Sequence, residues 1–131
     1  MDRDTELYRQ VSPSFIREGR VTRQVFLLTE KDKGELSVYD GSMISPKQSY
    51  LHFTVKYGSA GVLSVTVADC LGLGLNVKSA PKEFREHAVI AFPDSFQKSK
   101  AVLKNIAIKL RDLAVGYGWK YGPFFSVTTT D

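Results

Sequence analysis

The sequence predicts a single α+β domain, with a mixed or antiparallel sheet of roughly five or six strands and about three helices. Three observations indicate this class. The chain has 131 residues, of which 43% are hydrophobic and 24% charged, as is typical of one globular domain. Short apolar segments of strand length are interspersed with capped helical segments, and no linker or internal repeat divides the chain. We therefore assign residues 1–122 to the domain and expect residues 123–131 to form a flexible tail.

Six segments have the length and the alternating or continuously apolar character of strands. In one of them Leu36 and Val38 alternate with Ser37 and Tyr39. The run AVIAF that follows His87 is continuously apolar, which is typical of a buried strand. The predicted strands are 7–11, 21–29, 35–39, 62–65, 76–78 and 87–92.

Two short helices are predicted from their N-terminal caps, and SPS (12–14) marks a stop or a further helix start. In SPKQ (45–48), serine can cap, proline suits the first helical position and glutamine can complete a capping box. This helix should extend to about residue 56. A second capping box, TVAD (66–69), predicts a short helix through Cys70 that glycine residues end. The residues of the first helix expected to face the core are Tyr50, Leu51, Phe53 and Val55.

The last helix has the clearest pattern, and it is predicted from Asp94 or Ser95 to about Val115. We expect Trp119 and Tyr121, which follow it, to pack back onto the sheet. The apolar stripe on this helix consists of Val102, Leu103, Ile106, Leu110 and Leu113.

The charge of the chain is concentrated near the C-terminus. Residues 1–94 contain equal numbers of basic and acidic residues, so residues 95–131 supply the whole net charge of +4. A basic excess confined to one helix indicates either a site for a nucleic acid or an ordinary solvated face. The residues of the candidate nucleic-acid site are Lys100, Lys104, Arg111 and Lys120.

Several kinds of chemistry lack the residues they require. Two histidines and one cysteine, with no Cys-x-x-Cys motif, predict no metal site, and no cofactor is predicted. Cys70 would need His52 or His87 as a base, and its apolar neighbours favour a buried thiol instead. The chain has no apolar run of membrane-spanning length and no apolar segment at its N-terminus, so we expect a cytoplasmic protein without a membrane partner.

Two residues stand out as candidate functional groups. Arg9 lies in the middle of a predicted strand, LYRQV, that has apolar residues toward both of its ends, and it needs either a buried carboxylate or an anionic ligand. His87 opens a predicted strand beside a charged loop, where it is either a satisfied edge histidine or an acid–base group. As anchors for a protein interface we single out Tyr39, Trp119 and Tyr121.

Two resemblances bear on function. The order of LYRQV, Gly19-Arg20, Phe26, LSVYDG, VTVADCLGLGL and EHAVI resembles a group of small bacterial proteins of uncharacterised activity. The strand arginine Arg9, the Gly19-Arg20 segment and the strand 36–39, which the helix starting at Ser45 follows, carry a second and weaker likeness. In this order they resemble RES-type toxins and related ADP-ribosyltransferase-like folds. That likeness implies that Arg9 holds the phosphate of a nicotinamide nucleotide, with Ser37 or Tyr39 near the ribose. The expected catalytic glutamate has only Glu83 and Glu86 as candidates.

Three functions therefore remain open. The first is a non-catalytic bacterial domain that binds another protein, such as an immunity or antitoxin-like factor or an accessory component of a defence locus. The second is a nucleic-acid-binding protein that uses the basic C-terminal helix. The third is an ADP-ribosyltransferase-like, NAD-processing enzyme, for which the candidate residues are Arg9, Ser37, Tyr39 and His87. The lack of a recognisable catalytic motif favours the first function.

Overall fold

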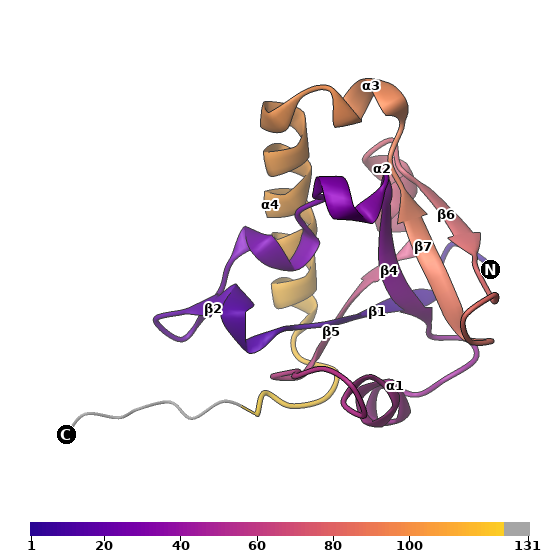
Figure 1. Cartoon of the computed structure of the whole chain (residues 1–131), viewed down its shortest axis with the longest axis vertical. Helices are drawn as coiled ribbons and strands as arrows, with labels where there is room; N and C mark the ends of the chain where they lie inside the picture. The colour runs from indigo at the N-terminus through magenta and orange to yellow at the C-terminus, as the bar shows by residue number, and fades with distance from the viewer. Residues whose placement is uncertain (125–131) are drawn as a thin grey trace.

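An antiparallel sheet of five strands forms the centre of the structure, a computed structural model that describes residues 1–124 (Figure 1). The strand order is β5-β1-β4-β7-β6, and every neighbouring pair is antiparallel. The α+β class predicted from the sequence is thus confirmed. The strands are β1 (Glu6–Gln10), β4 (Glu35–Asp40), β5 (Val62–Thr66), β6 (Asn76–Ser79) and β7 (His87–Ala91).

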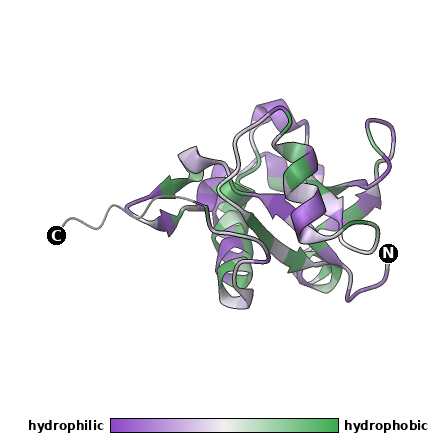
Figure 2. Cartoon of the chain, turned by 90° about the horizontal axis from the view of Figure 1, so that it is seen from below, coloured by the Kyte–Doolittle hydropathy of each residue, from purple (hydrophilic) through white to green (hydrophobic). Residues whose placement is uncertain are grey.

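The two faces of the sheet differ in chemistry because side chains alternate along each strand. Leu7 and Val11 point into the main hydrophobic core, whereas Tyr8 belongs to a second, smaller cluster on the opposite face. The register pairs Tyr39 with both Tyr8 and His87, so these aromatic and polar residues share the second face. In Figure 2 the strands and helices carry both hydrophobic (green) and hydrophilic (purple) residues, as is expected of elements with one buried and one exposed face.

The main core lies between the sheet and α4 (Lys100–Tyr117), which is the long helix that the sequence predicts. Ile106 and Leu110 are buried, and the rest of the predicted stripe packs against the core. The predicted helix is nevertheless divided, because α3 (Asp94–Gln97) ends before Ser99. Ser99 has an extended backbone and caps α4 by accepting a hydrogen bond from the Val102 amide at 3.2 Å.

The predicted strand 21–29 is wrong. Its first residue belongs to a hairpin of β2 (Ile16–Arg17) and β3 (Arg20–Val21), and 3₁₀ turns η2 (Arg23–Phe26) and η3 (Glu30–Asp32) follow. Val25 and Phe26 are adjacent and both fully buried against the core. A strand would send these two side chains to opposite faces, so tertiary packing overrides the local strand preference. A further 3₁₀ turn, η1 (Pro13–Phe15), confirms the helix start at Ser12, whose hydroxyl accepts from the Ser14 amide.

Helix α1 (Pro46–Phe53) covers part of the second face of the sheet and has the predicted capping box at Ser45. The expectation that Leu51 and Val55 face the core is wrong, because they are 52% and 80% exposed. The fully buried residue is Ser49, whose hydroxyl accepts a hydrogen bond from Gln10 Nε2 at 3.1 Å. The residue of α1 that is buried against β1 is therefore polar, because the side chain that it meets there, Gln10, is polar. Helix α2 (Val67–Gly72) also has its predicted capping box and buries Cys70.

The segment after α4 returns to the edge of the sheet, as predicted. Trp119 packs against the main core and Tyr121 against the second cluster. The amide of Val62 donates to the carbonyl of Tyr121 at 2.9 Å, and the Phe124 amide donates to the carbonyl of Ala60 at 2.6 Å. Of the predicted tail, Phe124 thus contacts the domain, and residues 125–131 lie outside the described residues.

Candidate ligand-binding pocket

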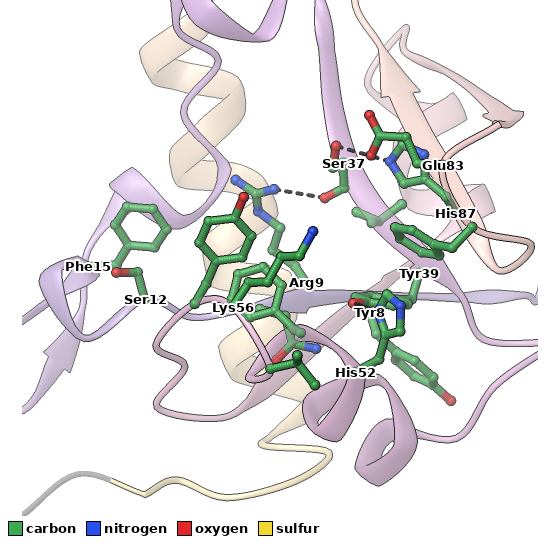
Figure 3. Close-up of a pocket in the computed structure, with 16 residues that line it drawn as sticks. Tyr8, Arg9, Ser12, Phe15, Ser37, Tyr39, His52, Lys56, Glu83 and His87 are labelled. Carbon is green, nitrogen blue, oxygen red and sulfur yellow. Dashed lines mark hydrogen bonds between the residues drawn. The ribbon is translucent and has the colours of Figure 1, made fainter. Parts of the chain in front are cut away.

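The pocket opens where strands β1 and β4 separate. They pair at Leu7↔Asp40 and Tyr8↔Tyr39, and no ladder pair follows toward Gln10. A cavity of about 760 Å³ lies over this opening, walled by the second face of the sheet, by α1 with residues 55–57, and by residues 83 and 84 (Figure 3). This volume is in the range of small-molecule sites.

Arg9 spans the opening. Its Nε donates to the carbonyl of Val25 at 2.8 Å, and its Nη1 donates to the carbonyl of Ser37 at 2.7 Å. Arg9 forms no ion pair with a carboxylate anywhere in residues 1–124. Burial lowers the pKa of the guanidinium, and the more distant charge of Asp32 acts in the opposite direction. Among the described residues, this partly buried positive charge thus donates its hydrogen bonds to neutral carbonyl groups.

Ser37 and His87 form a hydrogen-bonded pair in the same cavity. Ser37 Oγ lies 3.1 Å from His87 Nε2, and His87 Nδ1 lies 2.9 Å from the carbonyl oxygen of Ala80. Ser37 is exposed to the cavity, whereas His87 is only 9% exposed. The cross-strand register explains this pair, because Ser37 on β4 lies diagonally opposite His87 on β7.

Aromatic rings form a wall of the cavity. Tyr39 Oη lies 2.7 Å from His52 Nδ1, and the Phe84 ring packs against Tyr39, His52 and His87 with centroid distances of 5.1, 4.7 and 4.9 Å. Burial, with a contribution from the charge of Glu86, raises the pKa of Tyr39 to about 12. Tyr39 therefore keeps its proton at neutral pH.

Two charged side chains complete the lining. Lys56, just after α1, makes no side-chain hydrogen bond or ion pair with the described residues, and in Figure 3 it reaches toward the centre of the cavity. Glu83 also lines the cavity, whereas Glu86 is not among its lining residues. The arrangement can hold an anionic group near Arg9 and Lys56, and a flat ring beside the aromatic wall.

The structure thus brings together all four residues that the sequence nominates for an enzyme: Arg9, Ser37, Tyr39 and His87. Sequence reasoning missed Lys56 as a pocket residue, and it considered His52 only as a partner of Cys70. The helix of His52 was expected to turn its apolar residues to the core. Tyr50 and Phe53 pack against the second cluster as expected, whereas Leu51 is exposed and His52 lines the pocket.

The candidate nucleic-acid residues do not form one uniform basic surface. Lys100 and Lys104 are exposed on α4, but Arg111 pairs with Asp112 at 2.9 Å and Lys120 pairs with Glu6 at 2.8 Å. Of the candidate interface anchors, Tyr39 is buried, while Trp119 and Tyr121 are partly buried against hydrophobic clusters.

A second groove of about 960 Å³ lies between the β2–β3 hairpin and α4. Arg17, Arg20, Arg23 and Arg111 line it together with Trp119. The first three are exposed and make no side-chain contact with a carboxylate among the described residues. Glu18 and Asp112 also line the groove, so four arginines there lie beside two carboxylates. The even charge balance of residues 1–94 gave no indication of this cluster, because its arginines come from β2, β3 and η2 and from α4.

Cys70 is fully buried, and burial together with the charge of Asp69 raises the pKa of its thiol to about 12. This supports the interpretation of Cys70 as a core residue. Across residues 1–124, no three side chains of His, Cys, Asp or Glu gather as a metal site would require. None of the helices described has the length and apolar character needed to cross a membrane.

Comparisons with protein-family models, with curated proteins and with solved structures give no match for this chain. The pocket is therefore interpreted from its own geometry.

Proposed function

We propose that the pocket binds a nucleotide, with Arg9 and Lys56 holding its phosphate and the aromatic wall holding its base. The observation that carries the proposal is the charge of Arg9, which is partly buried and has no carboxylate partner within residues 1–124. Phosphate oxygens accept from a guanidinium in a bidentate manner, and they would supply the missing negative charge. The Phe84 ring, which is only partly buried in the cavity wall, offers flat apolar surface to a base.

Isothermal titration calorimetry with AMP, ADP-ribose and NAD⁺ tests this proposal, with neutral adenosine as the probe that lacks phosphate. Arg9→Gln should weaken binding by about 10- to 100-fold, as expected for a lost charge-assisted hydrogen bond. Lys56→Gln should weaken it by a smaller factor because its lysine is exposed. Arg3→Gln and Lys47→Gln are matched controls, since both residues are exposed outside the pocket. Equal binding of adenosine and AMP, or no binding of any nucleotide, would contradict the proposal.

The NAD-processing hypothesis is the special case in which the nucleotide is a nicotinamide dinucleotide. It gains support from the position of Glu83 in the pocket, because the weaker resemblance requires a glutamate near the bound ribose. The test is NAD⁺ turnover by the wild-type chain and its loss in Arg9→Ala with the fold retained. Absence of turnover, with nucleotide binding intact, would contradict the NAD-processing hypothesis and leave the proposed nucleotide binding standing.

The arginine groove supports a second candidate function, the binding of a nucleic-acid backbone. Arg17 and Arg20 face each other across the β2–β3 hairpin, although like charges directly opposite destabilise a strand pair. A polyanion in the groove would relieve this repulsion. Affinity for a single-stranded RNA should fall steeply with salt, and Arg17→Glu with Arg20→Glu should abolish it, whereas Lys100→Glu with Lys104→Glu should change it little. The reverse pattern would place the site on α4, where the sequence indicates either a nucleic-acid site or a solvated face.

The non-catalytic protein-interaction domain stays a prediction. A candidate contact surface is formed by exposed apolar residues near the end of α1, where Leu51, Val55 and Tyr57 are 52%, 80% and 63% exposed. An affinity pull-down from the native host, with and without nuclease, tests it. One stoichiometric protein that survives nuclease is the expected result, and a partner lost with the nucleic acid would favour the arginine groove.

A further inference from the structure

We infer that Ser37 and His87 act as a nucleophile and its general base, and that they cleave a carboxylic ester bound in the pocket. The inference deepens and rests on the proposed function, because the anionic group held near Arg9 is then part of the ester substrate.

The two neighbours of His87 determine its tautomer. A carbonyl oxygen only accepts, so Nδ1, which lies 2.9 Å from the Ala80 carbonyl, carries the proton. In the neutral ring Nε2 then has the free lone pair, and it lies 3.1 Å from Ser37 Oγ. The serine hydroxyl therefore donates to Nε2. This is the orientation in which a histidine removes the proton of a serine nucleophile.

The pair also has the access that such chemistry requires. Ser37 is exposed to a cavity of about 760 Å³, whereas His87 is largely shielded beneath the Phe84 ring. Figure 3 shows the Ser37 hydroxyl and the His87 ring turned toward each other at the cavity wall. If the hydrogen bond between Ser37 and His87 only stabilised the sheet, Ser37 would not need to be exposed to a cavity.

Positive charge lies next to the nucleophile. Arg9 Nη1 donates to the backbone carbonyl of Ser37 at 2.7 Å, so a guanidinium sits against the residue that would attack. Charge that develops on the ester oxygen during attack is stabilised by such a fixed cation. The Ala80 carbonyl takes the place of the carboxylate in a serine–histidine–aspartate triad and orients the ring without adding negative charge.

The reaction balances without a cofactor. Ser37 Oγ forms a bond to the ester carbonyl carbon while its proton passes to His87 Nε2. The bond from that carbon to the alkoxy oxygen breaks, and His87 returns the proton to the leaving alcohol. Water, deprotonated by His87, then attacks the acyl-serine, which releases the carboxylic acid and restores the serine hydroxyl.

A fluorophosphonate probe tests the pair without knowledge of the natural substrate, since an activated serine displaces its fluoride and becomes phosphonylated. Intact-mass spectrometry of the full chain should show one adduct, and peptide mapping should place it on Ser37. Ser37→Ala should abolish it, and His87→Gln should slow it by about 100-fold or more. Ser12→Ala is the matched control, because Ser12 lines the same cavity but its hydroxyl contacts Ser14 rather than a histidine.

Ser37→Ala keeps the result interpretable if the buried His87 does not tolerate substitution, because Ser37 is exposed. An unlabelled wild-type chain, or an adduct that persists in Ser37→Ala, overturns the inference. Calorimetry with ADP-ribose separates it from the proposed function. Binding without labelling overturns the nucleophile alone, whereas labelling at Ser37 without nucleotide binding supports the nucleophile and overturns the proposed ligand.

Discussion

Replacing Arg9 with methionine separates a binding role from a structural one. Methionine keeps most of the length of the side chain but removes the charge and both hydrogen bonds, to Val25 and Ser37. Hydrogen bonds from a charged group contribute about 1.5–3 kcal/mol each, so their loss alone would cost about 3–6 kcal/mol. Removing a partly buried charge that has no ionic partner among the described residues offsets several kcal/mol of this loss.

We therefore expect Arg9→Met to change the free energy of unfolding by no more than about 2 kcal/mol, while nucleotide binding falls by about 100-fold. Urea denaturation followed by the fluorescence of Trp119, the single tryptophan of the chain, measures the first quantity. Calorimetry on the folded variant measures the second. A destabilisation above about 4 kcal/mol would refute the reasoning. It would mean that the hydrogen bonds to the two carbonyl groups stabilise the fold by more than the burial of the charge costs.

Three further predictions concern the fold around the pocket. The pKa values of Cys70 and Tyr39 are each raised to about 12, from 9.0 and 10.0. The unfolded chain therefore loses these protons first, and stability should fall as pH rises from about 9 to 12, with a slope near 1.4 kcal/mol per pH unit for each group. Denaturant titrations across this range check the slope, and Cys70→Val should flatten its lower part. Leu110→Ala should cost about 2–5 kcal/mol because Leu110 is fully buried under the sheet, whereas Val115→Ala on the exposed side of α4 should cost little. Gly61→Ala should destabilise strongly, because Gly61 has a φ of +146° and a Cβ there would lie 2.6 Å from the Tyr121 carbonyl oxygen. A melting temperature equal to that of Gly72→Ala, where a Cβ meets nothing within 4 Å, would contradict this prediction.

The sequence predicts correctly those elements that depend on interactions between residues close together in the chain. The capping boxes at Ser45 and Thr66 form as expected, because each joins residues three positions apart. The segment 21–29 was mispredicted for the opposite reason. Val25 and Phe26 turn to the same core, and the Val25 carbonyl accepts from Arg9 rather than from a neighbouring strand. Neither contact can be recognised from the local sequence pattern, because each depends on residues that are distant in the sequence.

The candidate site was predictable to the extent that single residues were unusual in their setting. A strand arginine and a strand-end histidine drew attention, and Ser37 and Tyr39 came with the resemblance. The sequence could not show that these residues meet, because their meeting depends on the pairing of β4 with β7 and on the separation of β4 from β1. Lys56 remained hidden because an exposed lysine after a short helix is common.

The central claim is that the second face of the sheet binds an anionic ligand at Arg9. Nuclear magnetic resonance with ¹⁵N-labelled protein and AMP tests it most directly, through the amide shifts that the ligand changes. The account predicts that the changes centre on residues 9, 37–39, 56 and 84–87, and that they are lost in Arg9→Gln. Changes confined to residues 17–23, or no changes at millimolar AMP, would contradict it.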